Sequence, residues 1–362
     1  MHINSRNLCI GCMRPLGFEM TCLYCGLKQD EYIPIPSCLT PGTVLMDKYI
    51  IGKVLDHGAF GIIYIAWDMI MDIPVAIKES FPREMVSRDI ICGAGNEIYL
   101  YKNTKKKEYE DYLKKFYYEA KCLSRFNQVE GIVSVRDFFY DNNTAYIVMQ
   151  YIEGISLKCY IEENGRIPGK KVLRMIRPLL MALEQVHRAG IIHRDISPDN
   201  IMIKPDQSLV LIDFGAACMR DINTVQTVKV MFKRGYSPEE QYHCEGRWGP
   251  YTDVYSICAT MYFMMAGVTP MDSVIRALND DMTFLVGMKA AGISSLQRRA
   301  VMKGLAVDKN NRWQNIDELC QALYKDYGEV THSEAWRHQR NKIILIVGFV
   351  LILLGTMLGA AC

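Results

Sequence analysis

The segment from His193 to Asn200 holds the side chains with the clearest chemical potential in this chain. It reads His-Arg-Asp-Ile-Ser-Pro-Asp-Asn and follows a helical run, so the carboxylate of Asp195 and the amide of Asn200 stand five residues apart. Phosphoryl transfer needs an acceptor that orients the attacking hydroxyl and an oxygen ligand for the Mg²⁺ that gathers the phosphates. Such residues also occur in ordinary polar turns, so the rest of the chain has to decide between the two interpretations.

The composition indicates a folded protein with no overall charge preference. The chain has 362 residues, 50% of them hydrophobic, which is enough for two or three domains with well-built cores. Lys and Arg number 42 against 40 Asp and Glu, so no nucleic-acid partner is expected. The 13 cysteines, four of them in two Cys-x-x-Cys pairs, are typical of a reducing compartment. The N-terminus lacks the apolar core of a secretory signal.

Two Cys-x-x-Cys pairs lie near the N-terminus, Cys9 with Cys12 and Cys22 with Cys25. Four thiolates held in two short turns can converge tetrahedrally on Zn²⁺. Because so short a segment buries little apolar surface, metal binding would supply most of its folding free energy, on the order of 10 kcal/mol. We expect a structural zinc ribbon at residues 1–28, which could also hold a partner. Unmetallated or redox-active cysteines are the alternative.

Three stretches rich in β-branched and aromatic residues, 49–55, 62–67 and 73–79, predict strands of an antiparallel sheet. The turn between the first two strands contains Gly58 and Gly61. Glycines there would let the backbone approach phosphates closely and point N–H groups at them. Two turn glycines are weak evidence by themselves, so the interpretation depends on the residues of the third strand.

The third strand carries Val-Ala-Ile-Lys, and with Lys78 the chain begins to resemble a protein kinase. Glu119 lies on a helical stretch where kinases place the partner of that lysine. Asp213-Phe214-Gly215 follows a predicted apolar strand, as the second metal-binding carboxylate does in kinases. Pro238-Glu239-Glu240 stands where kinases have Ala-Pro-Glu. The resemblance covers residues 49–325 and implies an α+β, bilobal protein kinase fold of the bacterial, eukaryotic-like type.

The resemblance implies a role for each member of the site. Asp195 would accept or orient the substrate hydroxyl, while Asn200 and Asp213 would hold Mg²⁺ against the phosphates of ATP. Lys78 would position those phosphates, and Glu119 would hold Lys78. If the helix that carries Glu119 swings away, the lysine loses its partner, which offers a regulatory switch.

The resemblance also implies a nucleotide pocket between the lobes. The hinge at residues 150–152 would hydrogen-bond adenine between apolar walls, although each wall residue alone is equally compatible with ordinary core. The residues implied in nucleotide binding are Leu55, Gly58, Gly61, Ile63, Ala76, Lys78, Met149, Gln150, Ile152 and Met202.

Further features concern the framework of the two lobes. The long connection between Lys78 and Glu119 predicts a loop and a lengthened, solvated helix, or alternatively a docking surface for an acidic partner. In the large lobe, a buried Glu240–Arg312 pair is implied by the resemblance. Apolar spacing predicts a helix at 172–183 that is kinked by Pro178 or begins late. Further strands are predicted at 133–139 and 144–149, and further helices at 252–267, 283–291, 294–304 and 315–325.

Three positions depart from the kinase pattern. Asp56 replaces the first glycine of the phosphate loop, and Ser197 replaces the lysine two residues after the catalytic aspartate. Lys233 stands where serine/threonine kinases usually have threonine. We hypothesise that Lys233, or Lys229 as the second choice, restores the charge that Ser197 lacks. Asp56 and Ser197 favour the alternative of a pseudokinase scaffold.

The activation segment raises a separate expectation. Kinases with an arginine before the catalytic aspartate, here Arg194, often need a phosphate that neutralises it. Thr224 and Thr227 lie in the segment that could carry one. A small-molecule phosphotransferase would share the catalytic logic, but the Pro238-Glu239-Glu240 segment with Asp253 favours a polypeptide substrate.

The stretch 343–361 has no charged residue and is almost wholly apolar. As a helix it would span about 28 Å, close to the roughly 30 Å hydrocarbon core of a bilayer. Basic residues precede it at 337–342, so the positive-inside rule predicts a single-pass membrane protein with the kinase domain in the cytoplasm. The expected organisation is a zinc ribbon (1–28), a linker (29–48), an N-lobe (49–151), a C-lobe (152–325), a juxtamembrane segment (326–342) and a transmembrane helix (343–361).

Overall fold

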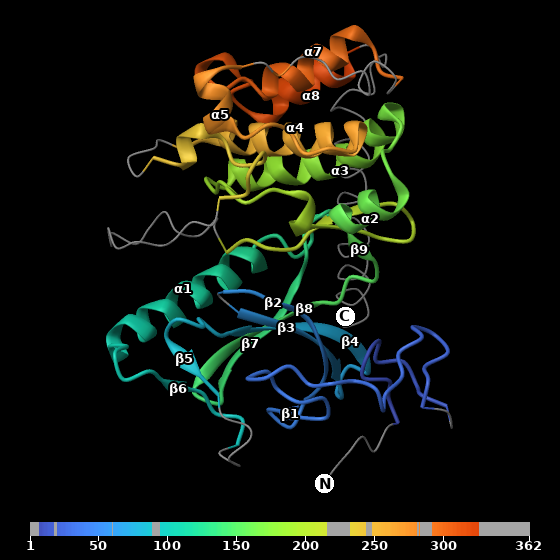
Figure 1. Ribbon diagram of the computed structural model, residues 1–362, viewed down its shortest axis with the longest axis vertical. Helices are drawn as coiled ribbons and strands as arrows, with labels where there is room; N and C mark the ends of the chain where they lie inside the picture. The colour runs from blue at the N-terminus through green and yellow to red at the C-terminus, as the bar shows by residue number, and fades with distance from the viewer. Residues whose placement is uncertain are drawn as a thin grey trace, which may run out of the picture.

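The computed structural model shows a strand-rich small lobe and a helical large lobe (Figure 1). The predicted transmembrane and juxtamembrane segments and the predicted helix at 283–291 lie outside the residues that it describes. Within the described part of the chain, no helix is long and apolar enough to cross a membrane. The structure describes residues 7–17, 20–59, 61–88, 95–215, 232–243, 248–280, 282 and 292–325.

The small lobe is built on an antiparallel sheet with strand order β1-β2-β3-β4-β8-β7. The predicted strands at 49–55, 62–67, 73–79 and 144–149 are confirmed, each with slight extension, and the strand predicted at 133–139 is shifted by two residues. The strands are β1 (Val44–Leu45), β2 (Tyr49–His57), β3 (Gly61–Asp68), β4 (Ile73–Ser80), β7 (Val135–Asp141) and β8 (Thr144–Gln150).

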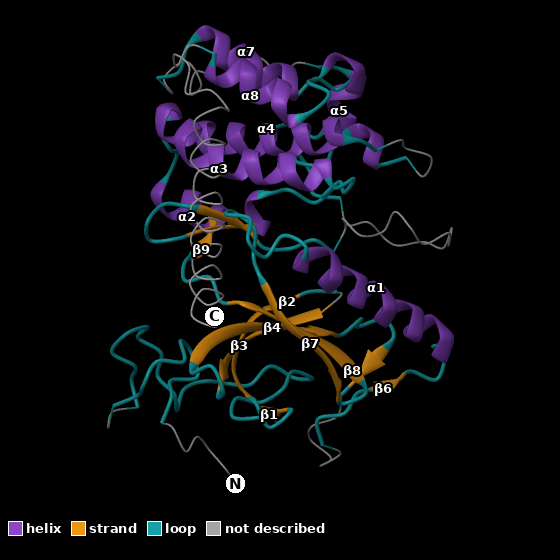
Figure 2. Ribbon diagram, turned by 180° about the vertical axis from the view of Figure 1, so that it is seen from behind, coloured by secondary structure: helices purple, strands orange, loops and turns teal. Residues whose placement is uncertain are grey.

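One face of this sheet, here called the inner face, supports α1 (Lys106–Ser124), which runs beside β7 and β8 (Figures 1 and 2). Side chains alternate between the two faces of a strand, so Ala76 and Lys78 of β4 share the inner face while Ile77 and Glu79 share the outer one. Ala76 joins the core that continues into the large lobe, and Ile77 joins a separate core on the outer face.

The outer face is covered by segments that the sequence predicts to be a loop and a linker. In the long connection, β5 (Val86–Ser87) pairs with β6 (Tyr99–Leu100), and Phe81 is buried against the sheet. From the predicted linker, Cys38 and Leu39 are buried in the same core. Both segments are therefore partly integrated into the small lobe, because their apolar residues cover strand residues that alternation leaves on the outer face.

A charged pair lies at the centre of this outer core. The side chains of Glu79 and Arg88 are fully buried and ion-paired. Glu79 also accepts hydrogen bonds from the hydroxyls of Tyr64 (2.7 Å) and Tyr146 (2.8 Å). Arg88 donates to the carbonyl of Ser37 at 3.0 Å, which ties the predicted linker to the long connection. The sequence does not predict this pair, because nothing in the spacing links the two residues.

The large lobe is mainly helical, and a short sheet of order β11-β10-β9 lies at its junction with the small lobe (Figure 1). Its core surrounds α4, in which nearly every residue is buried. The helices predicted at 252–267, 294–304 and 315–325 are confirmed within two residues. The elements are β9 (Ile155–Ser156), α2 (Leu157–Asn164), α3 (Gly169–Arg188), β10 (Ile201–Ile203), β11 (Leu209–Leu211), α4 (Pro250–Ala266), α5 (Ser273–Leu278), α7 (Ser295–Gly304) and α8 (Ile316–Tyr324).

Helix α3 shows how a buried stripe overrides local propensity. It runs without interruption from Gly169 to Arg188 and contains Pro178, so the alternative of a late start is wrong. The predicted apolar stripe is buried, and packing of an amphipathic face supplies most helical stability in proteins. The buried Glu240–Arg312 pair implied by the resemblance is also present, with N–O distances of 2.7 and 2.9 Å.

Candidate active site

The catalytic loop places Asp195 and Asn200 side by side. A short 3₁₀ turn at Pro198–Asn200 folds the chain back, so that Nδ2 of Asn200 donates to Oδ2 of Asp195 at 2.7 Å and to its backbone carbonyl at 2.9 Å. Burial raises the pKa of Asp195 to about 6, which Lys233 and Asn200 oppose. The carboxylate is thus poised as a proton acceptor at neutral pH.

A second aspartate, Asp253 at the start of α4, hydrogen-bonds the backbone of this loop. It is fully buried and accepts hydrogen bonds from the backbone N–H groups of His193 (2.7 Å) and Arg194 (2.8 Å). Nε2 of His187 lies 2.8 Å from the same carboxylate. Arg194 adopts φ = 65°, an unusual value for a residue other than glycine. These bonds hold the loop in that conformation, and they tie His187 of α3 to the start of α4.

Lys78 lies between two carboxylates from different parts of the chain. Its Nζ lies 2.6 Å from Oε1 of Glu119 on α1 and 3.1 Å from Oδ1 of Asp213, which follows β11. Burial opposes the ammonium, but Asp213 and Glu119 outweigh it and hold the pKa of Lys78 above its usual range. Burial raises the pKa of Glu119 to about 7 despite Lys78. The predicted pair between Lys78 and Glu119 is therefore present, with Asp213 as a third member.

Asp213 is held as a charged group. Burial would raise its pKa, but Lys78 and the backbone N–H of Gly215 (2.9 Å) outweigh that effect and keep the pKa well below its usual range. The next residue, Phe214, is fully buried and meets the ring of His193 edge-on, with centroids 4.5 Å apart. Burial lowers the pKa of His193 to about 4, so this contact is made by a neutral ring. The contact joins Asp213 to the catalytic loop.

Lys233 reaches the catalytic loop from the segment before α4. Its Nζ donates to Oγ of Ser197 at 2.9 Å and lies 3.2 Å from Oδ1 of Asp195. Its backbone N–H bonds to Oγ of Ser237 at 3.1 Å. Gly235, with φ = 83°, brings the backbone so close to Pro270 that a Cβ would lie 2.5 Å from that residue's carbonyl oxygen. This geometry agrees with the hypothesis that Lys233 supplies the charge missing at Ser197. The alternative residue, Lys229, lies outside the described residues.

The phosphate loop between β2 and β3 is a tight turn in which the N–H of Gly58 donates to the carbonyl of Gly61 at 3.0 Å. A Cβ on Gly61 would lie 2.6 Å from the carbonyl oxygen of Glu79, so this position requires glycine. The unusual Asp56 is exposed, and its carboxylate accepts the N–H of His57 at 2.8 Å. Its charge is therefore solvated and is partly satisfied at the end of β2.

The residues implied in adenine binding come from both lobes. Ala76 and Met149 are cross-strand neighbours of β4 and β8, and the hinge residue Ile152 is buried beside them. Met202, on β10 of the large lobe, packs against the same core, while Leu55 on β2 is 40% exposed. Ile63 and Gln150 complete the predicted set, on β3 and at the end of β8, and Gln150 is exposed. These residues come from segments that are distant from one another in the sequence.

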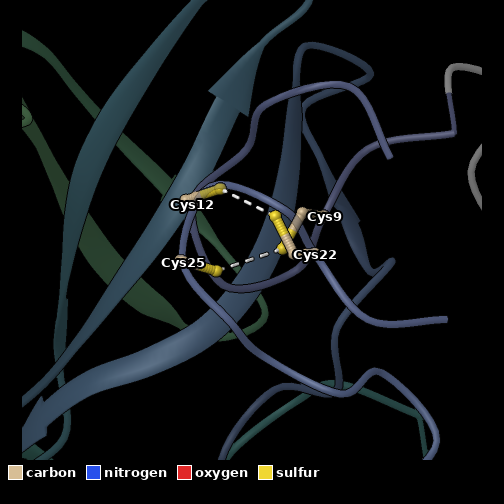
Figure 3. A group of neighbouring side chains, drawn as sticks. All are labelled: Cys9, Cys12, Cys22 and Cys25. Carbon is tan, nitrogen blue, oxygen red and sulfur yellow. Dashed lines mark hydrogen bonds between the residues drawn. The ribbon is translucent and has the colours of Figure 1, made fainter. Parts of the chain in front are cut away.

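The four N-terminal cysteines converge, as Figure 3 shows. Their sulfur atoms all lie within 4.8 Å of one another, with Cys9–Cys25 at 3.6 Å and Cys12–Cys22 at 3.7 Å. A tetrahedral ion with Zn–S bonds of about 2.3 Å would set its sulfurs about 3.8 Å apart. The donor set and its spacing therefore fit Zn²⁺.

Residues 86–334 match the family model of the protein kinase domain. The chain is 30% identical over 228 residues to the serine/threonine-protein kinase PknL of Mycobacterium tuberculosis, covering 63% of this chain and 51% of that protein. It is 29% identical over 235 residues to the serine/threonine-protein kinase PrkC of Bacillus subtilis, covering 64% and 32%. The chain thus spans about half the length, or less, of these curated relatives.

Solved structures give the same result. A structure described as PpkA-294 in its apo form has a TM-score of 0.67 and 32% identity, covering 79% of this chain and 99% of that chain. Rad53 1–466 in complex with AMP-PNP has a TM-score of 0.56 at 20% identity, covering 76% and 64%, and supports the fold alone. The family match spans well over half of the chain and includes the catalytic loop. The chain therefore belongs to the protein kinase family, and the bacterial relatives it matches are serine/threonine kinases.

Proposed function

We propose that this chain is a serine/threonine protein kinase that transfers the γ-phosphate of ATP to protein hydroxyls, its own among them. The observation that carries the proposal is the pair of contacts that Lys78 makes with Glu119 and Asp213. Three segments distant in sequence meet there, and the bonded pair Asp195 and Asn200 follows α3 in the neighbouring loop. The solvated carboxylate at Asp56 and the lysine beside Ser197 weaken the two sequence arguments for a pseudokinase.

In the proposed reaction, Asp195 orients the substrate hydroxyl and accepts its proton as the oxygen attacks the γ-phosphorus. The bond from that phosphorus to the oxygen bridging the β- and γ-phosphates breaks, and ADP leaves. Lys78 would bind the α- and β-phosphates and fix the donor. Asn200 and Asp213 would hold Mg²⁺, which neutralises phosphate charge when it is bound. Because the transition state is largely dissociative, positioning and charge neutralisation contribute more than the strength of the base.

Lys233 has a proposed part in the same step. Its ammonium lies between Asp195 and Ser197, where the transferring phosphoryl group would pass next to the accepting hydroxyl. A cation at that point would stabilise the charge that develops on the phosphoryl oxygens. It also keeps the pKa of Asp195 lower than burial alone would, so the base stays ionised.

The proposal is tested by autophosphorylation of the purified full chain with Mg·ATP, with the Asp213→Asn variant as the matched control. We expect incorporation of phosphate on serine or threonine in the wild type and none in the variant. Equal labelling of both proteins, or no labelling of either with any added protein substrate, would contradict the proposal. Mass spectrometry of residues 216–235 would then test whether Thr224 or Thr227 carries the phosphate predicted to neutralise Arg194.

The cysteine cluster is proposed to hold one structural Zn²⁺ through Cys9, Cys12, Cys22 and Cys25. The support is the sulfur spacing together with the N–H of Gly11, which points at Sγ of Cys9 at 3.3 Å and would stabilise a thiolate. Release of metal into a colorimetric chelator on thiol modification should give one Zn²⁺ per chain. A metal-free protein that folds normally would contradict it.

Tethering to a membrane is also proposed, from the uncharged apolar stretch 343–361 and the basic residues before it. The proposed arrangement is single-pass, with the kinase domain in the cytoplasm and protein substrates within its reach. Expression of the full chain and of residues 1–342, followed by fractionation, tests it. Equal recovery of both proteins from the non-membrane fraction would contradict the proposal.

A further inference from the structure

The cysteine module, defined here as the described residues between Asn7 and Gln29, lies against the hinge side of the small lobe. Figures 1 and 2 both show this loop-rich segment at the opposite end of the sheet from α1. Leu8 and Met13 form a small apolar cluster with Ile65 of β3, and the hinge residue Tyr151 packs against it. The module therefore contacts both the sheet and the hinge.

The contact is made by the turn between the first two cysteines. The carbonyl of Ile10, inside the Cys9–Cys12 turn, accepts the backbone N–H of Lys53 on β2 at 2.8 Å. Arg14, two residues after the turn, lies 2.7 Å from the carboxylate of Glu153, just beyond the hinge. That ion pair is exposed, so it contributes little stability to the contact by itself. The turn that would hold the metal is thus also the docking element.

The two cysteine turns differ at one equivalent position. The residue after Cys25 is Gly26, with φ = 71°, and the residue after Cys12 is Met13, with φ = 58°. Left-handed backbone favours glycine, so a methionine there carries a conformational cost. Met13 is 2% exposed, whereas a Cβ on Gly26 would meet nothing within 4 Å. Met13 therefore has a backbone conformation that a methionine disfavours, and its side chain is buried in the contact with the small lobe.

The opposing surface on β2 is shaped to receive that side chain. A Cβ on Gly52 would lie 2.0 Å from Cε of Met13 and 2.5 Å from the carbonyl oxygen of Ile10. Gly52 and Lys53 stand three and two residues before Leu55, one of the residues that the kinase resemblance implies in nucleotide binding. A change in docking would therefore act on β2 and on the hinge, two of the elements that contribute residues to the implied nucleotide site.

We infer that the cysteine module is a positioning element for the nucleotide: its metal-held first turn fixes β2 and the hinge through Met13 and Ile10. The inference rests on the proposed kinase function and the proposed zinc site. Undocking the module, or removing the metal, weakens nucleotide binding. It leaves the phosphoryl-transfer step nearly unchanged because Lys78 and Asp195 are held by other elements.

The test uses the full chain with two undocking variants, Gly52→Ala and Met13→Gly. Met13→Gly removes the docked side chain at a left-handed position that glycine adopts readily, and retention of Zn²⁺ shows whether the module keeps its own fold. Gly17→Ala is the matched control, because a Cβ there meets nothing within 4 Å. We expect both undocking variants to retain one Zn²⁺, to exchange amide hydrogens faster at residues 7–17, and to bind a non-hydrolysable Mg·ATP analogue at least fivefold more weakly. The control should match the wild type.

The kinetic signature separates positioning from general damage. Undocking should raise KM for ATP at least fivefold with kcat changed less than twofold, and Cys25→Ser should reproduce that pattern through loss of the metal. Analogue affinity within twofold of the wild type in the two undocking variants would overturn the inference, and so would unchanged hydrogen exchange in both. Wild-type affinity in the metal-free variant would overturn the link to the metal. A wild-type chain that fails to bind the analogue would instead overturn the proposed function itself.

Discussion

Lys78 and Glu79 are neighbours on β4, yet their side chains enter two different charged sites on opposite faces of the sheet. On the inner face, Lys78 contacts Glu119 and Asp213; Glu119 is buried, whereas the side chains of Lys78 and Asp213 are 13% and 36% exposed. On the outer face, Glu79 pairs with Arg88, and both side chains are fully buried. One site is proposed to bind phosphates, and the other holds peripheral segments to the sheet.

The two sites differ in how completely their charges are satisfied. Glu79 has Arg88 and the hydroxyls of Tyr64 and Tyr146 as donors, so the outer site is saturated and has no capacity for a ligand. On the inner face a single ammonium serves two carboxylates, and the pKa of Glu119 is raised to about 7 by burial. The inner site is therefore short of positive charge, which suits the proposed binding of a metal ion there.

The largest expected effect is on the outer site. Arg88→Met leaves the carboxylate of Glu79 buried without its cation. The free energy of unfolding should therefore fall by about 3–5 kcal/mol. Urea unfolding at pH 7 measures the change. The double variant Glu79→Leu with Arg88→Met removes both charges and should recover most of the loss. If the free energy of unfolding of Arg88→Met alone were within about 1 kcal/mol of the wild-type value, the contrast between the two sites would be wrong.

The next effect is on the inner site and is measured as activity. Lys78→Met removes the proposed phosphate contact, so kcat/KM should fall by about 10²–10³-fold or more. Lys114→Met is the control, since Lys114 is an exposed lysine of the same lobe on α1. A phosphorylation rate within threefold of the wild type in Lys78→Met would contradict the assignment of the site.

A smaller effect is expected at Lys233, where the readout is a pH profile. The pKa of Asp195 is about 6 and the base must be ionised, so kcat/KM should fall as the pH drops through about 6. Lys233→Ala removes a group that lowers this pKa, so the acid limb should move to higher pH, with about a 10- to 100-fold lower plateau.

The matched control for that lysine is Lys158→Ala. Lys158 lies 3.1 Å from Asp199 in the same loop and makes an exposed ion pair. Its removal should leave both the plateau and the midpoint unchanged. If Lys233→Ala behaved in the same way, the proposed compensation for Ser197 would be wrong.

The smallest effect is expected at Asp56. Because its carboxylate is exposed and accepts the N–H of the neighbouring His57, solvent screens it from the phosphates. Asp56→Gly should lower KM for ATP by less than about threefold, through loss of a screened like charge. Initial rates at varied ATP measure this. A tenfold change in either direction would show that the charge reaches the nucleotide.

Much of the proposed site could be predicted from the sequence because its members sit in short motifs with fixed local geometry. Asp195 and Asn200 are joined by one turn, and Lys78 lies on a strand whose alternation sets its face. Lys233 is suggested by the cation that is missing at Ser197. The order of the predicted strands and helices follows from apolar periodicity, which depends on neighbours along the chain.

Other features depended on segments that meet only in the folded protein. The sequence indicates that Glu79 lies opposite Lys78 on β4, but not that Arg88 covers it, because the connection between them has no periodic pattern. It predicts four cysteines around a metal, but not that Met13 would dock against Gly52.

The sequence by itself determined the motifs, the two-lobed fold and the candidate members of the proposed site. The tertiary structure alone decided which surfaces are covered and by what. Alternation and helical spacing record which face of an element is apolar, whereas the partner on that face is chosen by packing between residues distant in the chain.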